Sequence, residues 1–282
     1  MKILASLAPV WLFCLLLVPV HQGTDMPTDP LDVGLIAHYT FNACDARDDT
    51  GNGSDGVLFG APGCVCGVED DALWLDGSND FIEFHGRVNR YFTTSDFTIS
   101  FYFKPAKYSV FRQSLLSKRA ACDEYNMFDF LLDVNRREIN AAVHETPEIC
   151  YRNISPETDG TEWLHFALVR EGRFARTYIN GTLRKEAIRC SGVDLSNDAV
   201  LAFADSPCLG NGRTVRFKGA LDELRVYDRA LTETEIGLLY GRYPVQQAEI
   251  DCISFVPMPN FPLSFLLRNT DPQRLGQWQE AG

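Results

Sequence analysis

The chain has 282 residues, of which 45% are hydrophobic and 23% charged, and its formal net charge is −12. These proportions are typical of a globular protein and exclude a disordered or fibrous chain. An acidic surface repels phosphate groups, so we expect no nucleic-acid partner. The same acidity is compatible with calcium, which takes its ligands from carboxylate and carbonyl oxygens.

Residues 1–23 are predicted to be a signal peptide. Lys2 is the only formally charged residue in this segment, and an apolar run extends from Ile3 to Val20 before a short polar exit. This is the pattern of a cleaved secretory leader. The run is also about long enough to span a membrane, so an uncleaved anchor is the alternative. In both cases we expect a secreted or cell-surface protein, with no membrane insertion once the leader is removed.

A short linker, residues 24–33, is followed by a region with the two-residue period of β-strands, residues 34–241. Every odd position of Phe97–Phe103 is a large apolar residue, which places one face of that strand in a core. Trp163–Arg170 predicts a longer central strand, and Asn180-Gly181 predicts a hairpin turn. Further strands are expected at Leu35–Phe41, Ala72–Leu75, Phe81–Phe84, Ser114–Lys118, Met127–Leu132, Glu138–His144, Phe174–Asn180, Leu183–Arg189, Ala199–Ala204 and Thr214–Tyr227.

About a dozen short strands separated by turn residues are typical of an all-β protein built as an antiparallel two-sheet sandwich or jelly roll. One short helix is expected near the C-terminal end of this region, because Thr232 and Glu235 have the spacing of a capping box before an apolar stretch. Residues 242–282 contain five prolines and show no clear period. We interpret them as a Pro-rich tail or as the truncated start of another unit.

The cysteines predict disulfide bonds. Eight of the nine lie after the leader, and an even number in an exported chain favours bridges over thiol chemistry or metal binding. From their order, we expect Cys122 to pair with Cys150, and Cys190 with Cys208. Three pairings remain open for the other four, although Cys64 and Cys66 are too close together to expect a bond between them: Cys44, Cys64, Cys66 and Cys252.

Five motifs in order along residues 34–241 resemble the laminin-G-like family of concanavalin A-like jelly-roll domains. They are GLIAHYTFN at 34–42 with the DDTGNG loop at 48–53, ALWLDG at 72–77, FTISFYF at 97–103, the hairpin from Trp163 to Gly181, and GALDELRVYDRAL at 219–231. No single motif is specific, but five in register are. The resemblance implies a jelly-roll fold, with disulfides that belong to a subgroup of the family.

The resemblance also implies a structural calcium ion. In the family, a loop of this Asp-rich type supplies ligands together with an aspartate of the closing strand, which here names Asp48, Asn52 and Asp222, with the Gly51 carbonyl as a further candidate. Calcium suits such a loop because glycines let several oxygens converge at ~2.4 Å from the ion. The alternative is a metal-free turn stabilised by its own Asp and Asn side chains.

A glycan-cleaving hydrolase is a second function class to weigh, because laminarinase-type enzymes use the same sandwich. They carry two acidic residues on one strand face. Residues 157–162 spell E-x-D-x-x-E, but Pro156 and Gly160 predict a loop there, and Asp222 and Glu223 are adjacent and so point to opposite faces of their strand. We therefore expect no catalytic residues.

The sequence favours a non-enzymatic recognition or adhesion module that binds a glycan or an extracellular protein as part of a larger multidomain surface protein. A carbohydrate site needs exposed aromatic rings beside polar groups, and four rings in or near expected loops could serve: Tyr108, Tyr125, Phe128 and Tyr151. The alternatives are the laminarinase-like hydrolase and a purely structural spacer domain without a ligand.

Overall fold

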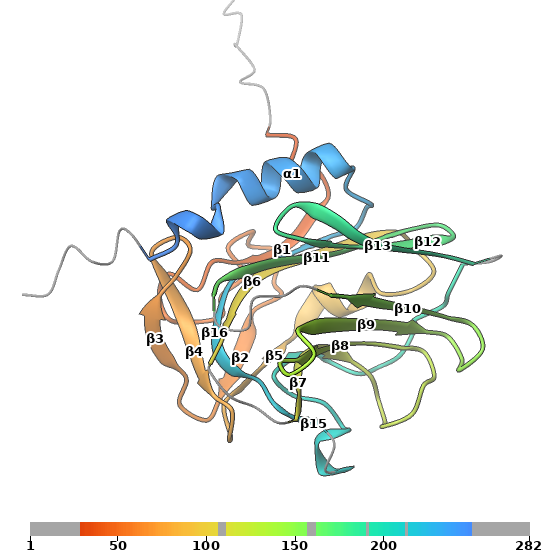
Figure 1. Ribbon diagram of the computed structural model, residues 1–282, viewed down its shortest axis with the longest axis horizontal. Coiled ribbons are helices and arrows are strands. Elements are labelled where there is room, and N and C mark those ends of the chain that lie inside the picture. The colour runs from red at the N-terminus through yellow and green to blue at the C-terminus, as the bar shows by residue number, and fades with distance from the viewer. Residues whose placement is uncertain (1–28, 107–110, 157–161, 190–191, 212–213, 250–282) are drawn as a thin grey trace, which may run out of the picture.

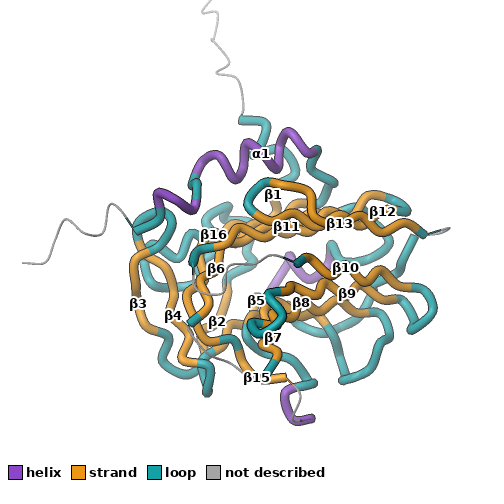
Figure 2. Tube along the Cα trace, in the orientation of Figure 1, coloured by secondary structure: helices purple, strands orange, loops and turns teal. Residues whose placement is uncertain are grey.

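The structure, a computed structural model, describes residues 29–106, 111–156, 162–189, 192–211 and 214–249. Within these ranges the chain forms two stacked β-sheets, A and B, and one α-helix, α1 (Glu233–Arg242), lies over the outer face of sheet A (Figures 1 and 2). No helix in these ranges has the length and apolar character needed to cross a membrane.

Sheet A has eight strands, and all its pairs are antiparallel. Strand β1 (Leu35–Tyr39) pairs with β16 off the main order, which runs β13 (Thr182–Ile188), β12 (Phe174–Ile179), β11 (Leu164–Glu171), β6 (Phe97–Pro105), β16 (Lys218–Tyr227), β4 (Asp71–Asp76) and β3 (Gly63–Cys66).

Sheet B also has eight strands. Strand β15 (Thr214–Arg216) pairs with β7 in the one parallel pair described, and the others are antiparallel in the order β10 (Cys150–Ser155), β9 (Glu138–His144), β8 (Met127–Asp133), β7 (Arg112–Lys118), β14 (Leu201–Phe203), β5 (Phe81–Phe84) and β2 (Gly56–Phe59). Three short 3-10 helices complete the described elements: η1 (Gly86–Arg90), η2 (Leu209–Asn211) and η3 (Val245–Gln247).

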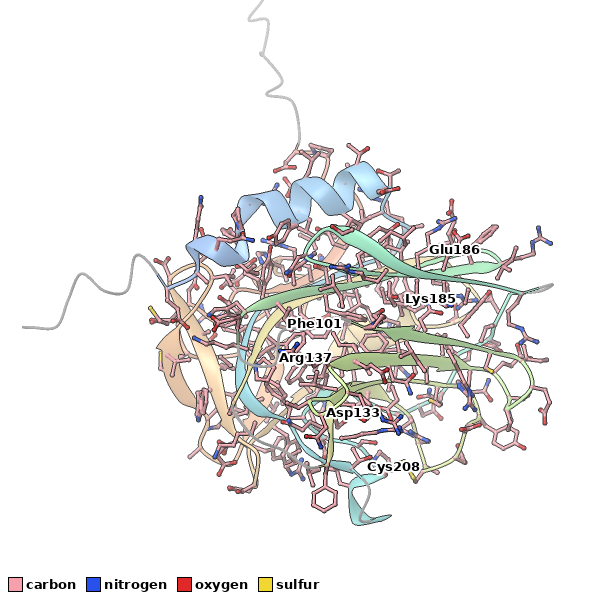
Figure 3. The ribbon with its side chains drawn as sticks, viewed as in Figure 1. Phe101, Asp133, Arg137, Lys185, Glu186 and Cys208 are labelled. Carbon is pink, nitrogen blue, oxygen red and sulfur yellow. A yellow bond between two sulfur atoms is a disulfide. The ribbon has the colours of Figure 1, made fainter. Side chains whose placement is uncertain are left out.

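The core lies between the two sheets, where the inward-facing residues of the central strands are fully buried. Phe101 of β6 lies at its centre (Figure 3), with its ring centroid 5.5 Å from that of Phe166 in sheet A and 5.7 Å from that of Phe203 in sheet B. Tilted and edge-on aromatic pairs of this kind add to the stabilisation from buried area. The alternation seen in the sequence therefore marks the inner faces of a two-sheet sandwich, as predicted.

The predicted helix and its cap are confirmed. The Thr232 hydroxyl accepts from the backbone N–H of Glu235, while the Glu235 side chain accepts from the backbone N–H of Thr232. Ile236 and Leu239 of α1 are buried against the outer face of sheet A. The segment after α1 also packs there, because the Glu249 carboxylate accepts from Lys104 Nζ at 2.6 Å and from the indole N–H of Trp163 at 2.9 Å.

One strand prediction was wrong, and three strands were not predicted. The single strand expected at Thr214–Tyr227 is divided at Phe217, because β15 pairs with β7 in sheet B while β16 crosses to sheet A. Strand β10 was not predicted, because Asn153 and Ser155 occupy two of its three inward positions and hide the apolar alternation. Strands β2 and β3 were missed as well; both are short, and their residues are only partly buried or exposed.

Candidate functional site

The outer face of sheet B carries a group of polar side chains set by strand register. Asp129 of β8 lies opposite Ala142 of β9, and Ala142 lies opposite Arg152 of β10. His144 and Asn140 flank Ala142 on the same face of β9, because side chains two residues apart point the same way. Four polar side chains therefore surround one methyl group, and this arrangement is called the Ala142 site below.

The Ala142 site is hollowed. A cavity of about 400 Å³ opens over it, within the size range of small-molecule sites. The small side chain of Ala142 leaves room that a larger residue would fill. The cavity is lined by Arg112, Arg119, Cys122, Asp123, Glu124, Met127, Asp129, Leu131, Asn140, Ala142, His144, Arg152, Cys208 and Thr214.

Several polar atoms of this site are buried without a hydrogen-bond partner among the described residues. They are Asp129 Oδ1, Asn140 Oδ1 and both ring nitrogens of His144. Leaving a buried polar group unsatisfied costs about 1–3 kcal/mol, so these atoms call for partners from solvent or from a ligand. Two of these three side chains are on β9 beside Ala142, and the third is opposite it on β8.

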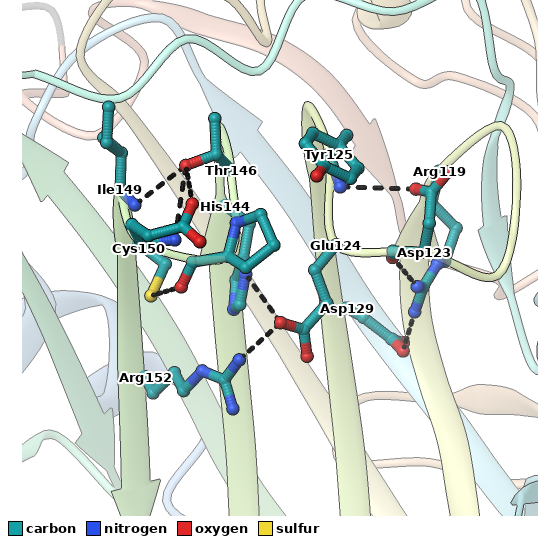
Figure 4. A network of polar contacts seen from close by, with 12 residues as sticks. Arg119, Asp123, Glu124, Tyr125, Asp129, His144, Thr146, Ile149, Cys150 and Arg152 are labelled. Carbon is teal, nitrogen blue, oxygen red and sulfur yellow. Dashed lines mark hydrogen bonds and ion pairs between the residues drawn. The ribbon is translucent and has the colours of Figure 1, made fainter.

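The charges in the Ala142 site are paired (Figure 4). Arg119 donates to Asp129 Oδ2 at 2.9 Å and to the backbone carbonyls of Ala121 and Asp123, while Arg152 donates to Glu124 Oε2 at 2.6 Å. The three arginines in the lining equal the three acidic residues in number, so the formal charge of the lining is zero in a chain of −12.

Burial controls the protonation of two groups in this site. It raises the pKa of Asp129 to about 6, against the opposing effect of Arg119. Burial, aided by the positive charge of Arg152, lowers the pKa of His144 to about 4. At neutral pH, Asp129 is therefore an ionised acceptor and His144 is a neutral ring with one donor and one acceptor.

A disulfide bond fixes one wall of the cavity. Cys122, in the loop that contains Asp123 and Glu124, is bonded to Cys208 across 86 residues of sequence. This corrects the expected pairings of Cys122 with Cys150 and of Cys190 with Cys208. Order along the chain misled because the bond depends on long-range contacts. β14 runs antiparallel to β7, so the segment after β14 lies beside the first half of β7, where the loop with Cys122 also lines the cavity with Arg112. Cys150 forms no disulfide within the described residues, and Cys190 lies outside them.

The structure describes one further disulfide bond. Cys44 is bonded to Cys64, one of the pairings left open by the sequence. Cys66 is also disulfide-bonded, and Cys252 lies outside the described residues.

The four aromatic residues considered for sugar binding have different fates. Tyr125 is 56% exposed and follows the lining residue Glu124 in the loop of Figure 4, but it is not itself part of the cavity lining. Phe128 and Tyr151 are buried and face the core. Tyr108 lies outside the described residues. Tyr125 is therefore the one of the four that the structure presents to solvent.

The loop expected to hold calcium is tightly hydrogen-bonded within itself. The Asp48 carboxylate accepts from the backbone N–H groups of His38, Thr50 and Ser54, and from the Thr50 hydroxyl. The Asn52 side chain donates to the carbonyl of Ile36 at 3.3 Å. These contacts suit an Asx-type turn and leave Asp48 with few free lone pairs.

The third expected ligand, Asp222, lies buried in β16. Its Oδ2 accepts from the backbone N–H of Val68 at 2.7 Å, and its Oδ1 has no hydrogen-bond partner among the described residues. Gly67 permits this approach, because a Cβ there would lie 2.3 Å from Asp222 Oδ2. Burial and the neighbouring Glu223 raise the pKa of Asp222 well above its usual value.

The segment that follows Gly67 and Val68 brings backbone carbonyl oxygens to Asn42, a residue that was not predicted as a ligand. One terminal atom of its amide lies 3.1 Å from Glu69 O, 3.2 Å from Asp71 O and 3.3 Å from Thr40 O. If that atom is the nitrogen, it donates to three carbonyls. If it is the oxygen, four oxygens converge at separations that suit the shell of a calcium ion. The backbone N–H of Glu69 also lies 3.5 Å from Asp222 Oδ2, which links the two groups.

Two further candidate sites are the E-x-D-x-x-E motif and a cluster of cysteine and aspartate side chains. Residues 157–161 of the E-x-D-x-x-E motif lie outside the described residues, and Glu162 is exposed. One described group of three Cys, His, Asp or Glu side chains has its ligand atoms within 4.8 Å of one another, namely Cys44, Cys64 and Asp71. Its two sulfurs are joined in a disulfide, so they are not available as thiolate ligands.

Comparison with protein families places the chain among related domains. Residues 76–237 match the family model described as the concanavalin A-like lectin/glucanases superfamily. No curated protein sequence matches the chain. Solved structures share its fold.

Three solved structures illustrate the likeness. Domain 4 of AbnA, a GH43 extracellular arabinanase from Geobacillus stearothermophilus solved with arabinotriose, matches with a TM-score of 0.59 and 21% identity over 73% of this chain and 98% of that chain. The binding domain of Paraclostridial Mosquitocidal Protein 1 matches with a TM-score of 0.62 and 16% identity over 74% and 52%. The botulinum neurotoxin DC binding domain, solved with rat synaptotagmin II, matches with a TM-score of 0.59 and 10% identity over 74% and 52%.

These identities are low enough that the likeness shows the fold alone. This chain spans about half the length of the two toxin binding domains but nearly all of the arabinanase domain.

Proposed function

Because the chain belongs to the concanavalin A-like lectin/glucanase superfamily, we propose that it is a non-enzymatic recognition module that binds a glycan in the Ala142 site. The supporting observation is the set of buried, unpartnered atoms on Asp129, Asn140 and His144 around one small residue. Sugar hydroxyls both donate and accept hydrogen bonds, so they can satisfy all three side chains. Tyr125 offers an exposed ring in the loop that carries the lining residue Glu124, on which a further sugar face could stack.

The described disulfide bonds support a role outside the cytosol. The described disulfides form in oxidising compartments. The predicted signal peptide, residues 1–23, lies outside the described residues. We propose a secreted or cell-surface protein, with this module as one part of a larger adhesive chain.

The decisive experiment is a glycan array probed with the disulfide-intact protein and two variants. Ala142→Leu fills the floor of the site and should abolish binding. Glu138→Gln, on the same face of β9 as Asn140 but outside the cavity lining, should leave binding unchanged. Glycan binding that survives Ala142→Leu would refute the assignment of the site, and silence on all glycans would favour a protein ligand or a spacer.

A hydrolase is the alternative within the same superfamily. Retaining glycosidases of this fold need two carboxyl groups about 5–5.5 Å apart. On β8, the residues two positions before and after Asp129 are Met127 and Leu131, so that strand offers no alternating acidic pair. Release of reducing sugar from a bound oligosaccharide, lost in Asp129→Asn, would support the hydrolase instead.

We further propose that a calcium ion, bound outside the Ala142 site, stabilises the fold. Its ligands would be Asn42 Oδ1, the carbonyls of Thr40, Glu69 and Asp71, and Asp222 Oδ1. The support is the convergence of oxygens at Asn42 and the buried, unpartnered oxygen of Asp222. Asp48 and Asn52 would then shape the adjoining loop rather than bind the ion. Bound calcium would supply charge and coordination that tie the loop before β4 to β16.

Asn42→Asp separates the two arrangements of this amide. With calcium bound, the variant gains a charged ligand, so the calcium-dependent rise in melting temperature should persist or grow. If no calcium binds, the variant places a carboxylate against three carbonyls. Its melting temperature should then fall both with and without added calcium. Direct titration with calcium by calorimetry completes the test, with Asp222→Asn expected to abolish the binding heat.

A further inference from the structure

We propose that the Ala142 site selects a neutral sugar ring and rejects carboxylated or sulfated glycans. This inference rests on the glycan-binding function proposed above and specifies the class of ligand.

The unpartnered atoms call mainly for donors from the ligand. Asp129 Oδ1 is a carboxylate oxygen and Asn140 Oδ1 is an amide oxygen, so each can only accept. Neutral His144 adds one donor and one acceptor. Hydroxyl groups of an unmodified sugar ring supply donors to the first two atoms and accept from the third.

An anionic substituent would meet the wrong groups here. A sulfate or carboxylate oxygen cannot donate, and beside Asp129 Oδ1 it would place two negative charges together in a partly desolvated site. The unpartnered atoms of Asp129 and Asn140 would then stay unsatisfied.

The arginines of the cavity do not offset this penalty, because each already faces an acid. Arg119 holds Asp129, Arg152 holds Glu124, and the third, Arg112, lies 3.6 Å from Asp133. Arg119 also donates to two backbone carbonyls, so its donors are largely used. An anion could recruit Arg119 only by separating it from Asp129, which would leave a buried carboxylate unpaired. Arg152 is 53% exposed, so its attraction for an anion is weakened by Glu124 and by solvent.

The geometry fits two hydroxyls of one ring. Asp129 lies directly across from Ala142, and Asn140 follows on the same face of β9, so the two acceptors are diagonal neighbours across adjacent strands. Diagonal neighbours of this kind have their Cβ atoms roughly 7 Å apart. A ring placed over the Ala142 methyl can reach both oxygens.

The test compares neutral glycans with anionic counterparts, on the intact protein. Neutral oligosaccharides, with arabinotriose and N-acetyllactosamine as first probes, are titrated beside sialylated and sulfated forms of N-acetyllactosamine and beside uronic-acid oligosaccharides. We expect neutral ligands to bind at least about tenfold more tightly than their charged counterparts, the ratio that corresponds to about 1.4 kcal/mol. The affinity should change little between about 0.1 M and 1 M NaCl, because no net charge is exchanged.

Two variants tie the preference to these atoms. Asn140→Ala removes one acceptor and should weaken neutral ligands about tenfold, while the control Glu138→Gln should not. Charged glycans that bind better than neutral ones, with binding still lost in Ala142→Leu, would overturn this inference and leave the proposed function standing. If no glycan of either kind binds, both fail.

Discussion

The guanidinium of Arg119 and the carboxylate of Asp129 form a buried ion pair, with Nη1 2.9 Å from Oδ2 and both side chains about 6% exposed. The pair connects the loop closed by Cys122 to the outer face of β8. Asp129 thereby has one oxygen held by Arg119 and the other turned to the cavity without a partner. The same residue contributes to stability and to the site.

Arg119→Ala should lower the free energy of unfolding by about 3–5 kcal/mol, because it leaves a buried carboxylate without its counter-charge. Arg136→Ala is the control, since Arg136 is 66% exposed beside Asp133 and exposed ion pairs contribute about 0–1 kcal/mol. Urea unfolding measures both. The double variant Arg119→Met, Asp129→Leu should recover most of the loss, and an equally unstable double variant would contradict the explanation.

The pH dependence of stability should carry the signature of Asp129. Its pKa is about 6 in the folded protein and 3.8 in the reference state, so between these values the folded protein binds a proton that the unfolded chain does not. This contribution destabilises the fold fully above pH 6 and is relieved as the pH falls towards 4. Unfolding curves across this range should differ from those of Asp129→Asn by such a slope.

Glycan affinity should follow the opposite direction over the same range. An ionised Asp129 accepts hydroxyl hydrogens, so affinity should fall as the pH drops through about 6. His144 stays neutral down to about pH 4, although Asp123, Glu124 and Arg152 also face the site. Calorimetry from pH 8 to 5 checks this prediction, and affinity that rises on acidification would contradict it.

Removing each described disulfide should have separable effects. Cys122→Ser with Cys208→Ser opens a loop of 86 residues and should cost about 4–5 kcal/mol in the chain-entropy model, with loss of glycan binding because a wall of the cavity is released. Cys44→Ser with Cys64→Ser opens a loop of 20 residues and should cost about 3 kcal/mol while binding persists. Equal loss of binding in both folded variants would contradict the assigned wall.

Gly67→Ala should destabilise the protein by about 1–3 kcal/mol, because its added methyl would overlap Asp222 Oδ2. Gly237→Ala in α1 is the matched control, since nothing lies within 4 Å of a Cβ there. It should raise stability by about 0.5–1 kcal/mol through helix propensity. Thermal unfolding with and without calcium compares the two, and Gly67→Ala should also reduce any shift that calcium produces.

The sequence by itself determined the two-sheet architecture, the capped helix and the central hairpin. These features depend on local periodicity and on short-range pairs such as Thr232 with Glu235, which are readable along the chain. It also identified Asp222 as a residue of interest, through the family resemblance.

Only the tertiary structure decided the site and the disulfides. Asp129, Asn140, Ala142 and His144 are ordinary residues on the polar side of two strands, and they become a site only when strand register places them around one methyl group. Cys122 meets Cys208 because β14 lies beside β7, a contact between segments far apart in sequence. Asn42 likewise meets the carbonyls of Glu69 and Asp71, which lie far from it in the sequence. Long-range register leaves no periodic trace in the sequence, so these relationships required the folded chain.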